Sequence, residues 1–185
     1  MGWGDFAADA GVTVNTDSAL GVPAIWAAVN FISGTLAGLP LEVYRKTPEG
    51  RQKIDNKFSN MIGTNVSEAM SSFEWRKYMF EQVLTGGRSV TYIERSAAGQ
   101  AINLYPLDPT HVRVEMLQDG RKIYRCYDKT YAATEVIDVP FMLKANQHDV
   151  RGPIGTNKDV IGMAIAATKY GSKAFQSGGI PPAVL

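Results

Sequence analysis

Few residues in this sequence have the types and the spacing that chemistry requires. His111 and His148 are far apart, and neither has a cysteine, histidine or glutamate partner at a metal-ligand spacing. The single cysteine, Cys126, lies in a predicted strand between Arg125 and Tyr127, where a buried and inert thiol is expected. The histidines are therefore interpreted as structural or solvent-exposed, and neither a zinc site nor a thiol nucleophile is predicted.

A segment near the C-terminus resembles a phosphate-binding loop only in part. Residues 152–159 read GPIGTNKD, without glycine directly before Lys158 and without serine or threonine directly after it. Those missing residues would let backbone amides cradle a phosphate and let a hydroxyl reach magnesium. The Gly86-Gly87 pair does not begin a Gly-x-Ser-x-Gly nucleophile elbow either. The sequence thus predicts no catalytic residue, no cofactor site and no metal ligand.

The composition is that of an ordinary globular chain. Its 185 residues are 45% hydrophobic and 20% charged, which suits one domain. Nineteen Lys and Arg residues against 18 Asp and Glu give a net charge of +1, without the basic excess of proteins that hold nucleic acid through phosphates. Basic pairs such as Arg76-Lys77 and Arg121-Lys122 lie among carboxylates, as on a solvated face. The lone cysteine favours a reducing compartment, and the first ten residues do not form a signal peptide.

The segment Ala24–Lys46 is the most apolar part of the chain, and it could anchor in a membrane, bind a partner or fill a core. A membrane helix needs about 20 mostly apolar residues. Polar residues interrupt this run, and Gly38-Leu39-Pro40 ends it. Pro23 suits a first helical turn, so a helix is predicted from about 23 to 37. No membrane span is expected.

Apolar residues cover most of the circumference of this predicted helix, and such a helix is usually buried. They are Ile25, Val29, Ile32 and Leu36 on one stripe, with Trp26 and Phe31 beside it. The alternating residues 41–46 and the turn at 47–50 then predict a hairpin. The segment is therefore interpreted as a buried helix that leads into a hairpin.

The remaining segments alternate between strands and helices. Ser71 and Glu74 form a capping-box pattern that opens a helix ending near Leu84. A last helix is predicted over 158–176, after a loop at 146–157, and Asp119-Gly120 is a strong hairpin signal. Strands are predicted at 89–94, 102–105, 112–116, 122–127 and 136–139. The predicted fold class is α+β, with mixed helices and antiparallel hairpins in a single domain.

Four segments that follow one another across nearly the whole chain form a joint pattern. They are Val22–Ser33 with Leu36–Leu41, Ser72–Arg76 leading into Leu84–Gly87, Leu104–Pro109 with Val112, and Ala174–Leu185. In this order they resemble the N-terminal part of the portal proteins of tailed double-stranded DNA bacteriophages. The chain departs from the family pattern at Arg88-Ser89, where Asn and Ala are common, and at Asp138, where His is common.

The resemblance implies a structural protein without hydrolytic chemistry. Portal proteins form a dodecameric ring at one capsid vertex, through which terminase packages DNA and through which DNA is ejected without sequence specificity. The implied partners are further copies of the chain, the terminase large subunit, the head-tail adaptor and the capsid protein, with no membrane. The implied location is the virion, with the host cytoplasm during assembly. Residues 1–22 would be an N-terminal arm and 23–185 a wing-like domain, with the stem, clip and crown segments beyond Leu185.

Two other classes of function stay open. A small α+β ligand- or protein-binding module without catalytic activity would need a cavity for its ligand. An enzyme domain would need a pocket with convergent polar groups and shifted titrations. The resemblance favours a portal fragment, which we expect to be a monomer or a weak oligomer on its own, because ring contacts need two complementary faces.

Overall fold

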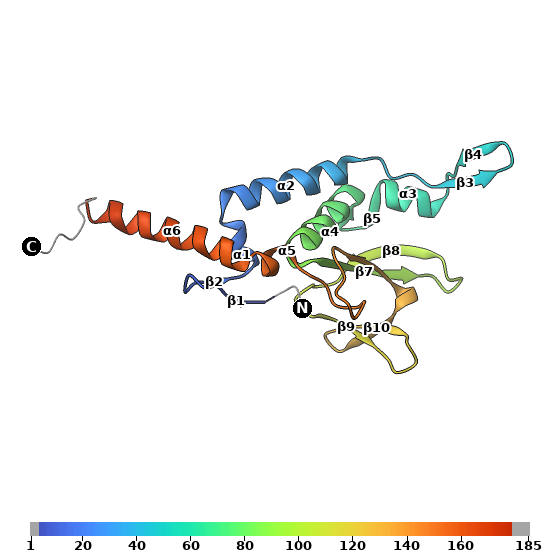
Figure 1. The fold of residues 1–185 in the computed structure, drawn as a ribbon. Coiled ribbons are helices and arrows are strands. Elements are labelled where there is room, and N and C mark those ends of the chain that lie inside the picture. The colour runs from blue at the N-terminus through green and yellow to red at the C-terminus, as the bar shows by residue number, and fades with distance from the viewer. Residues whose placement is uncertain (1–3, 179–185) are drawn as a thin grey trace, which may run out of the picture.

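Two helices, α2 (Pro23–Gly38) and α4 (Ser72–Gly86), lie against each other at the centre of the molecule. The structure is a computed structural model that describes residues 4–178. Around the helix pair the chain places two three-stranded antiparallel sheets, a projecting hairpin and the long helix α6 (Lys158–Gln176). The hairpin and α6 extend from opposite ends, which makes the molecule elongated (Figure 1). The predicted α+β class is confirmed.

Helix α4 begins at the capping box that the sequence predicts and ends at Gly86, two residues beyond the predicted Leu84. The Ser71 amide donates to Glu74 Oε2 at 2.8 Å, and the Glu74 amide donates to Ser71 Oγ at 3.2 Å, so the capping box is formed. After the last turn, Gly87 adopts the left-handed conformation with φ 89°. Its N–H donates to the carbonyl oxygens of Gln82 and Val83, which closes the helix.

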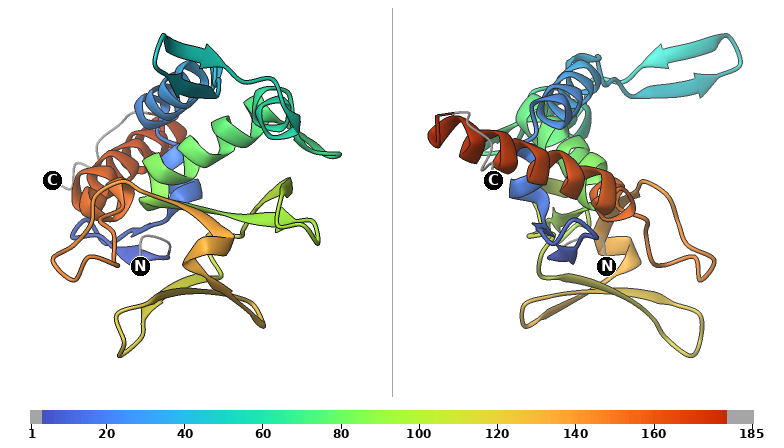
Figure 2. Two further views of the ribbon diagram at one scale, coloured as in Figure 1. Left: turned by 90° about the vertical axis from the view of Figure 1, so that its right-hand side faces the viewer. Right: turned by 60° about the vertical axis from the view of Figure 1, so that its left-hand side comes forward.

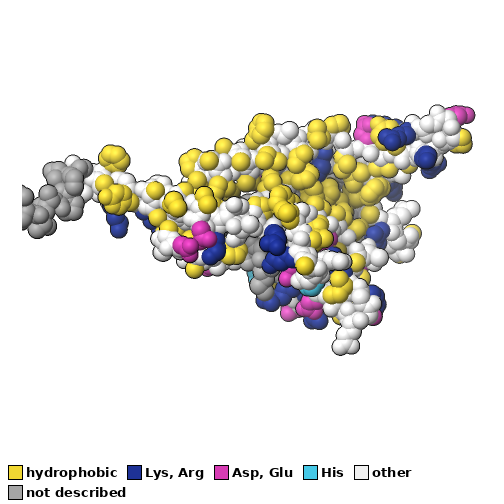
Figure 3. Space-filling view, in the orientation of Figure 1, with side chains coloured by type: hydrophobic (Ala, Val, Ile, Leu, Met, Phe, Trp, Pro, Cys, Tyr) yellow, Lys and Arg dark blue, Asp and Glu magenta, His cyan; other side chains and the backbone are white. Residues whose placement is uncertain are grey.

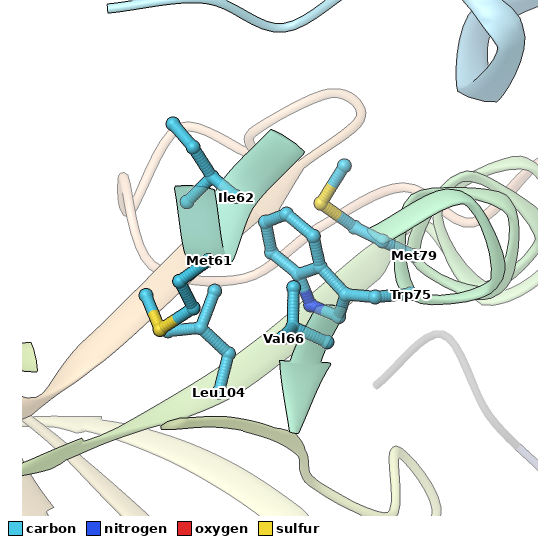
Figure 4. Packing of buried hydrophobic residues seen from close by; sticks show 6 residues of the cluster. All are labelled: Met61, Ile62, Val66, Trp75, Met79 and Leu104. Atoms are coloured by element: carbon cyan, nitrogen blue, oxygen red, sulfur yellow. The ribbon is translucent and has the colours of Figure 1, made fainter. Parts of the chain in front are cut away.

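The main hydrophobic core lies between α4, helix α3 (Lys57–Gly63) and the strands that pack against these two helices. The sequence patterns did not predict α3. The buried residues of the core come from four elements, and Figure 4 shows them converging: Met61, Ile62, Val66, Trp75, Met79 and Leu104. The indole Nε1 of Trp75 donates to Thr91 Oγ1 at 3.0 Å, so its polar atom is satisfied inside the core. Short strands β5 (Asn65–Ser67) and β6 (Met70–Ser71) join α3 to α4.

Two small antiparallel sheets account for the predicted strands. In one, β7 (Arg88–Arg95) lies between β12 (Val136–Pro140) and β8 (Ala101–Pro106). In the other, β10 lies between β9 and β11; these strands span Val112–Met116 (β9), Lys122–Cys126 (β10) and Lys129–Ala132 (β11). The short 3-10 helix η1 (Ala133–Glu135) links the sheets, and a buried cluster of Val90, Tyr124 and Val136 joins them.

The N-terminal residues pack against the C-terminal helices. The hairpin of β1 (Phe6–Ala7) and β2 (Thr13–Val14) precedes α1 (Thr16–Leu20). These elements share a buried cluster with α5 (Pro153–Thr156) and α6, formed by Ala8, Val14, Ala19, Ile154 and Ile161. The start of α6 therefore lies beside the N-terminal elements, whereas the rest of α6 extends away from them (Figures 1 and 2).

The predicted hairpin after α2 is confirmed, and it stands away from the rest of the molecule. Strands β3 (Tyr44–Thr47) and β4 (Gly50–Lys53) pair with each other, with Thr47 opposite Gly50 at the turn. Nearly all of their residues are exposed. Figures 1 and 2 show this hairpin projecting beyond α3 as an arm.

The expected burial of α2 is wrong. Only Ser33 and Ala37 are buried in this helix, whereas Trp26, Phe31 and Ile32 are exposed. The reason is that α4 covers one side of α2 and no other described element covers the opposite side to the same extent. Within residues 4–178, no helix is both long enough and apolar enough to cross a membrane.

The predicted loop from Asn146 to Asn157 is also wrong in part. Helix α5 occupies its second half, and Val150 forms an isolated bridge with Leu143 in its first half. Both features are too short to show a period of apolar residues, so the sequence pattern did not indicate them.

Candidate interaction surfaces

The outer face of α2 is an apolar surface without charges. From Ser18 to Leu41 the chain has no charged residue, although most of α2 lies at the surface. Phe31 is 73% exposed and Trp26 is 59% exposed. Figure 3 shows hydrophobic side chains spread over α2 and the region beneath it. Exposed apolar patches of this kind mark sites where another protein surface packs.

Helix α6 has a second apolar stripe that faces solvent. Ile161 and Gly162 are buried against the N-terminal elements, and Ile165 is partly buried against the same cluster. On other positions of the helix, Val160, Met163 and Tyr170 are each more than half exposed. Their spacing of three and seven residues keeps them on one side of the helix, and this spacing is a signal in the sequence that could have predicted the surface. Thus α6 has one covered and one uncovered apolar side.

A buried polar cluster lies between the two sheets. Arg88 Nε approaches Asp138 Oδ1 to 2.9 Å, which is ion-pair distance, but the two groups lack the alignment of a hydrogen bond. Lys122 Nζ lies 3.7 Å from the other carboxylate oxygen, and Tyr124 donates its hydroxyl to that oxygen at 2.7 Å. Burial, together with this hydrogen bond, raises the pKa of Tyr124. The ion pairs and the hydrogen bond of this cluster connect β7, β10 and β12.

A hollow of about 410 Å³ opens beside this cluster. Its lining combines apolar and charged side chains: Arg88, Val90, Pro109, Thr110, Val112, Arg113, Val114, Glu115, Asp149 and Val150. The four consecutive residues 112–115 all line it, although side chains on a strand alternate in direction. The hollow therefore runs along the backbone edge of β9, which is an edge strand of its sheet.

Asp108 organises the corner before β9. Hydrogen bonds from Thr110 come first in holding the pKa of Asp108 well below its usual range, and Tyr127 and His111 add to them. The His111 ring also stacks on Tyr127 at 4.2 Å between centroids. Within residues 4–178 no group of three or more potential metal ligands is assembled. His111 is held at this corner by the Tyr127 stack and by Asp108, whose Oδ2 lies 2.8 Å from its ring Nδ1.

The other sequence candidates also lie in structural positions. Cys126 is buried, and burial raises the pKa of its thiol, which keeps it in the less reactive protonated form. His148 bonds locally, with Nδ1 2.9 Å from the carbonyl oxygen of Asn146.

Residues 152–159, which resemble a phosphate loop in part, make a backbone contact at Gly152 and include the first residues of α6. A Cβ atom on Gly87 would lie 2.7 Å from the Cα of Gly152, so the two glycine backbones touch. Lys158 donates to the carbonyl oxygen of Ala7 at 2.7 Å, which ties α6 to the N-terminal hairpin. These residues join segments of the fold.

The family model for phage portal proteins matches residues 23–185. The chain belongs to the phage portal protein family. It is 30% identical to the probable portal protein of Streptomyces phage phiC31 over 96% of the chain and 42% of that protein. It is 28% identical to the portal protein of Enterobacteria phage HK97 over 65% of the chain and 29% of that protein. The portal chain therefore spans less than half the length of these relatives.

Solved structures show the same fold. An HK97-family phage portal protein from Corynebacterium diphtheriae matches with a TM-score of 0.60 and 17% identity, over 98% of this chain and 53% of that one. A chain from the neck of an empty GTA particle, computed with C6 symmetry, matches with a TM-score of 0.69 and 15% identity, over 87% of this chain and 46% of that one.

Proposed function

We propose that this portal chain is the wing part of a subunit that forms a closed ring at the capsid vertex. In the assembled virion the ring is the passage for double-stranded DNA during packaging and ejection, and terminase, the head-tail adaptor and capsid protein dock on it. The chain contributes structure to this ring and has no catalytic role. The observation that supports the proposal is the family match, which runs through every element from α2 to α6.

The uncovered apolar faces of α2 and α6 fit a part that is completed by assembly. A closed ring is built from heterologous contacts, in which one face of each subunit meets a different face of the next. Two separate uncovered faces on one chain are what such an assembly uses.

The test is the oligomeric state of the portal subunit that contains this chain. We expect end-on views in negative-stain electron microscopy to show closed rings of that subunit. Residues 1–185 alone should elute as a monomer or weak oligomer by gel filtration with light scattering. A subunit that stays monomeric at every concentration would contradict the proposal, and a stable dodecamer of residues 1–185 would show that the assembly surfaces lie mainly within this chain.

The hollow along β9 supports a second candidate, a ligand- or protein-binding module. Its volume of about 410 Å³ is within the range of about 300–1,000 Å³ that small-molecule sites occupy. A fragment screen by ligand-observed NMR tests this candidate. Hits whose signals disappear in a Val114→Trp variant, which fills the hollow, would favour it, and an absence of hits would leave the ring as the function.

A further inference from the structure

The projecting β3–β4 hairpin concentrates positive charge that is only partly neutralised. It carries Arg45, Lys46, Arg51 and Lys53 against the single carboxylate of Glu49. Lys46 and Arg51 are directly opposite each other in the strand register. Like charges at directly opposite positions destabilise a strand pair. The hairpin thus holds two cations together at a cost to its own stability.

Little else in the molecule supports this hairpin. Among residues 4–178, Lys53 is the one hairpin cation with an ion pair, to Glu42. A two-stranded hairpin alone is marginally stable in water. An arm that is exposed, basic and weakly supported is suited to a surface that supplies both packing and negative charge.

The opposite end of the same chain supplies such a surface. Residues 4–41 contain no Lys or Arg, but Asp5, Asp9 and Asp17 are exposed there. Asp159 of α6 joins them, since the Asp9 amide donates to Asp159 Oδ1 at 3.2 Å. The nearby cation, Lys158, neutralises only part of this charge. Figures 1 and 2 show the N-terminal elements and the hairpin on opposite sides of the molecule.

We propose that the β3–β4 hairpin of one copy docks on the acidic N-terminal end of the next copy. This inference rests on the proposed ring, because a head-to-tail contact between unlike ends is the heterologous contact that a ring repeats. Complementary charges at the two ends favour this pairing and disfavour hairpin against hairpin, which sets the direction of assembly. The contact needs no rearrangement, since both ends are exposed in the free chain.

Carbodiimide cross-linking of the purified chain tests the contact directly. The reagent joins lysine amines to carboxylates that touch them. We expect links from Lys46 or Lys53 to Asp9, Asp17 or Asp159, read by mass spectrometry. Such links must join two copies, because the two ends of one copy are far apart, and mixing ¹⁴N- and ¹⁵N-labelled chains confirms this. Hairpin links to other carboxylates only, or no links at the highest soluble concentration, would overturn the proposal.

Charge exchange gives an independent test. A hairpin variant, Lys46→Glu with Arg51→Glu, and an acidic-end variant, Asp9→Lys with Asp17→Lys, should each lose these links and the association seen by sedimentation velocity. Mixing the two variants should restore both, because each hairpin then meets an end of opposite charge. A matched control, Lys129→Glu with Lys144→Glu, makes the same charge change on exposed residues elsewhere and should behave as the parent chain.

The cross-linking and charge-exchange experiments can contradict the hairpin contact without contradicting the closed ring, and the reverse. If the hairpin variant of the full subunit still forms rings and mixing restores nothing, the hairpin contact is wrong and the ring stands. If the links form and respond to charge exchange while the subunit makes only open chains, the contact stands and the closed ring is wrong.

Discussion

Arg88 and Asp138 are two distant residues of opposite charge that the fold brings into contact. Neither position suggests a partner in the sequence, since fifty residues separate them. In the structure they form an ion pair with about a tenth of each side chain exposed. A buried charge that loses its partner is costly, so a change at one position favours a matching change at the other.

A double-mutant cycle tests this coupling. We expect Arg88→Asn alone to reduce the free energy of unfolding by about 3–5 kcal/mol, because Asp138 then keeps only weaker partners. The double variant, Arg88→Asn with Asp138→His, should lose less free energy of unfolding than the two single variants lose in sum, by about 0.5–3 kcal/mol. Urea unfolding measures each variant. The exposed pair of Arg121 and Asp119 is the control, and additive losses at Arg88 and Asp138 would rule out the coupling.

Asp108 predicts a loss of stability in acid. Its pKa is lowered in the folded state, first by hydrogen bonds from Thr110. A carboxyl group with a lowered folded pKa stabilises the fold above its unfolded pKa of about 3.9, and this contribution is lost as the pH falls below that value. Asp108→Asn should therefore be less stable than the parent at neutral pH, and the gap should narrow at about pH 3. A gap of constant size in urea unfolding at both pH values would contradict this role.

The elements with local boundary signals could be predicted from the sequence. Helices α2 and α4 begin near the predicted residues because Pro23 and the Ser71 capping box act within one turn. Helix α6 also begins at the predicted residue. The pair β9–β10 follows from its Asp-Gly turn. Helices α1 and α3 and the two-residue strands were not predicted, since they are too short to show a period.

Where the helices begin could be predicted from the sequence better than which of their sides are covered. Which side of α2 is covered depends on α4, which lies far along the chain. The exposed residues of α2 could not be predicted for the same reason. Arg88 and Asp138, or the two glycines at 87 and 152, meet only because the fold joins distant segments.

The junction of α4 and β7 predicts that Gly87 cannot be replaced. Gly87→Ala would place a Cβ in a left-handed residue and 2.7 Å from the Cα of Gly152. The left-handed conformation alone costs about 1–2 kcal/mol. Gly99 is the matched control, since it has φ 77° and a Cβ added there would meet no atom within 4 Å. Thermal unfolding should show a larger loss for Gly87→Ala than for Gly99→Ala, and equal losses would remove the packing role of the Gly87–Gly152 contact.

The two sides of α2 should respond differently to an added charge. Ala37→Asp buries a carboxylate, which costs several kcal/mol. Phe31→Asp changes an exposed residue and should leave the stability of the free chain within about 0.5 kcal/mol. Urea unfolding of the dilute chain compares the two variants. A large loss for Phe31→Asp would show that the outer face is already covered in the free chain.

For the whole molecule we expect weak DNA binding without sequence preference. The basic pairs noted in the sequence are engaged within the chain: Arg76 donates to the carbonyl oxygen of Ser72, and Lys77 pairs with Glu81. Arg121 and Lys122 pair with carboxylates in the same way. The net charge of +1 also leaves almost no excess of cations over carboxylates to neutralise phosphates.

Fluorescence anisotropy with a labelled duplex tests this expectation at about 50 mM and about 200 mM salt, a range over which a multi-phosphate binder loses about 10³-fold in affinity. We expect little binding at either concentration. Submicromolar binding at the higher salt would instead identify a DNA-binding module.

The uncharged outer face of α2 also limits how long a free copy of the chain stays in solution before it aggregates. An apolar helix face that is exposed to water can also contact any other free chain, so the proposed ring assembly would compete with precipitation for the same molecules. Assembly and precipitation both become faster as the concentration of free copies rises, and both are slow when the chain is very dilute. The yield of assembled particles would then depend on the rate of synthesis, with a slow and steady supply giving each copy time to find its correct neighbour.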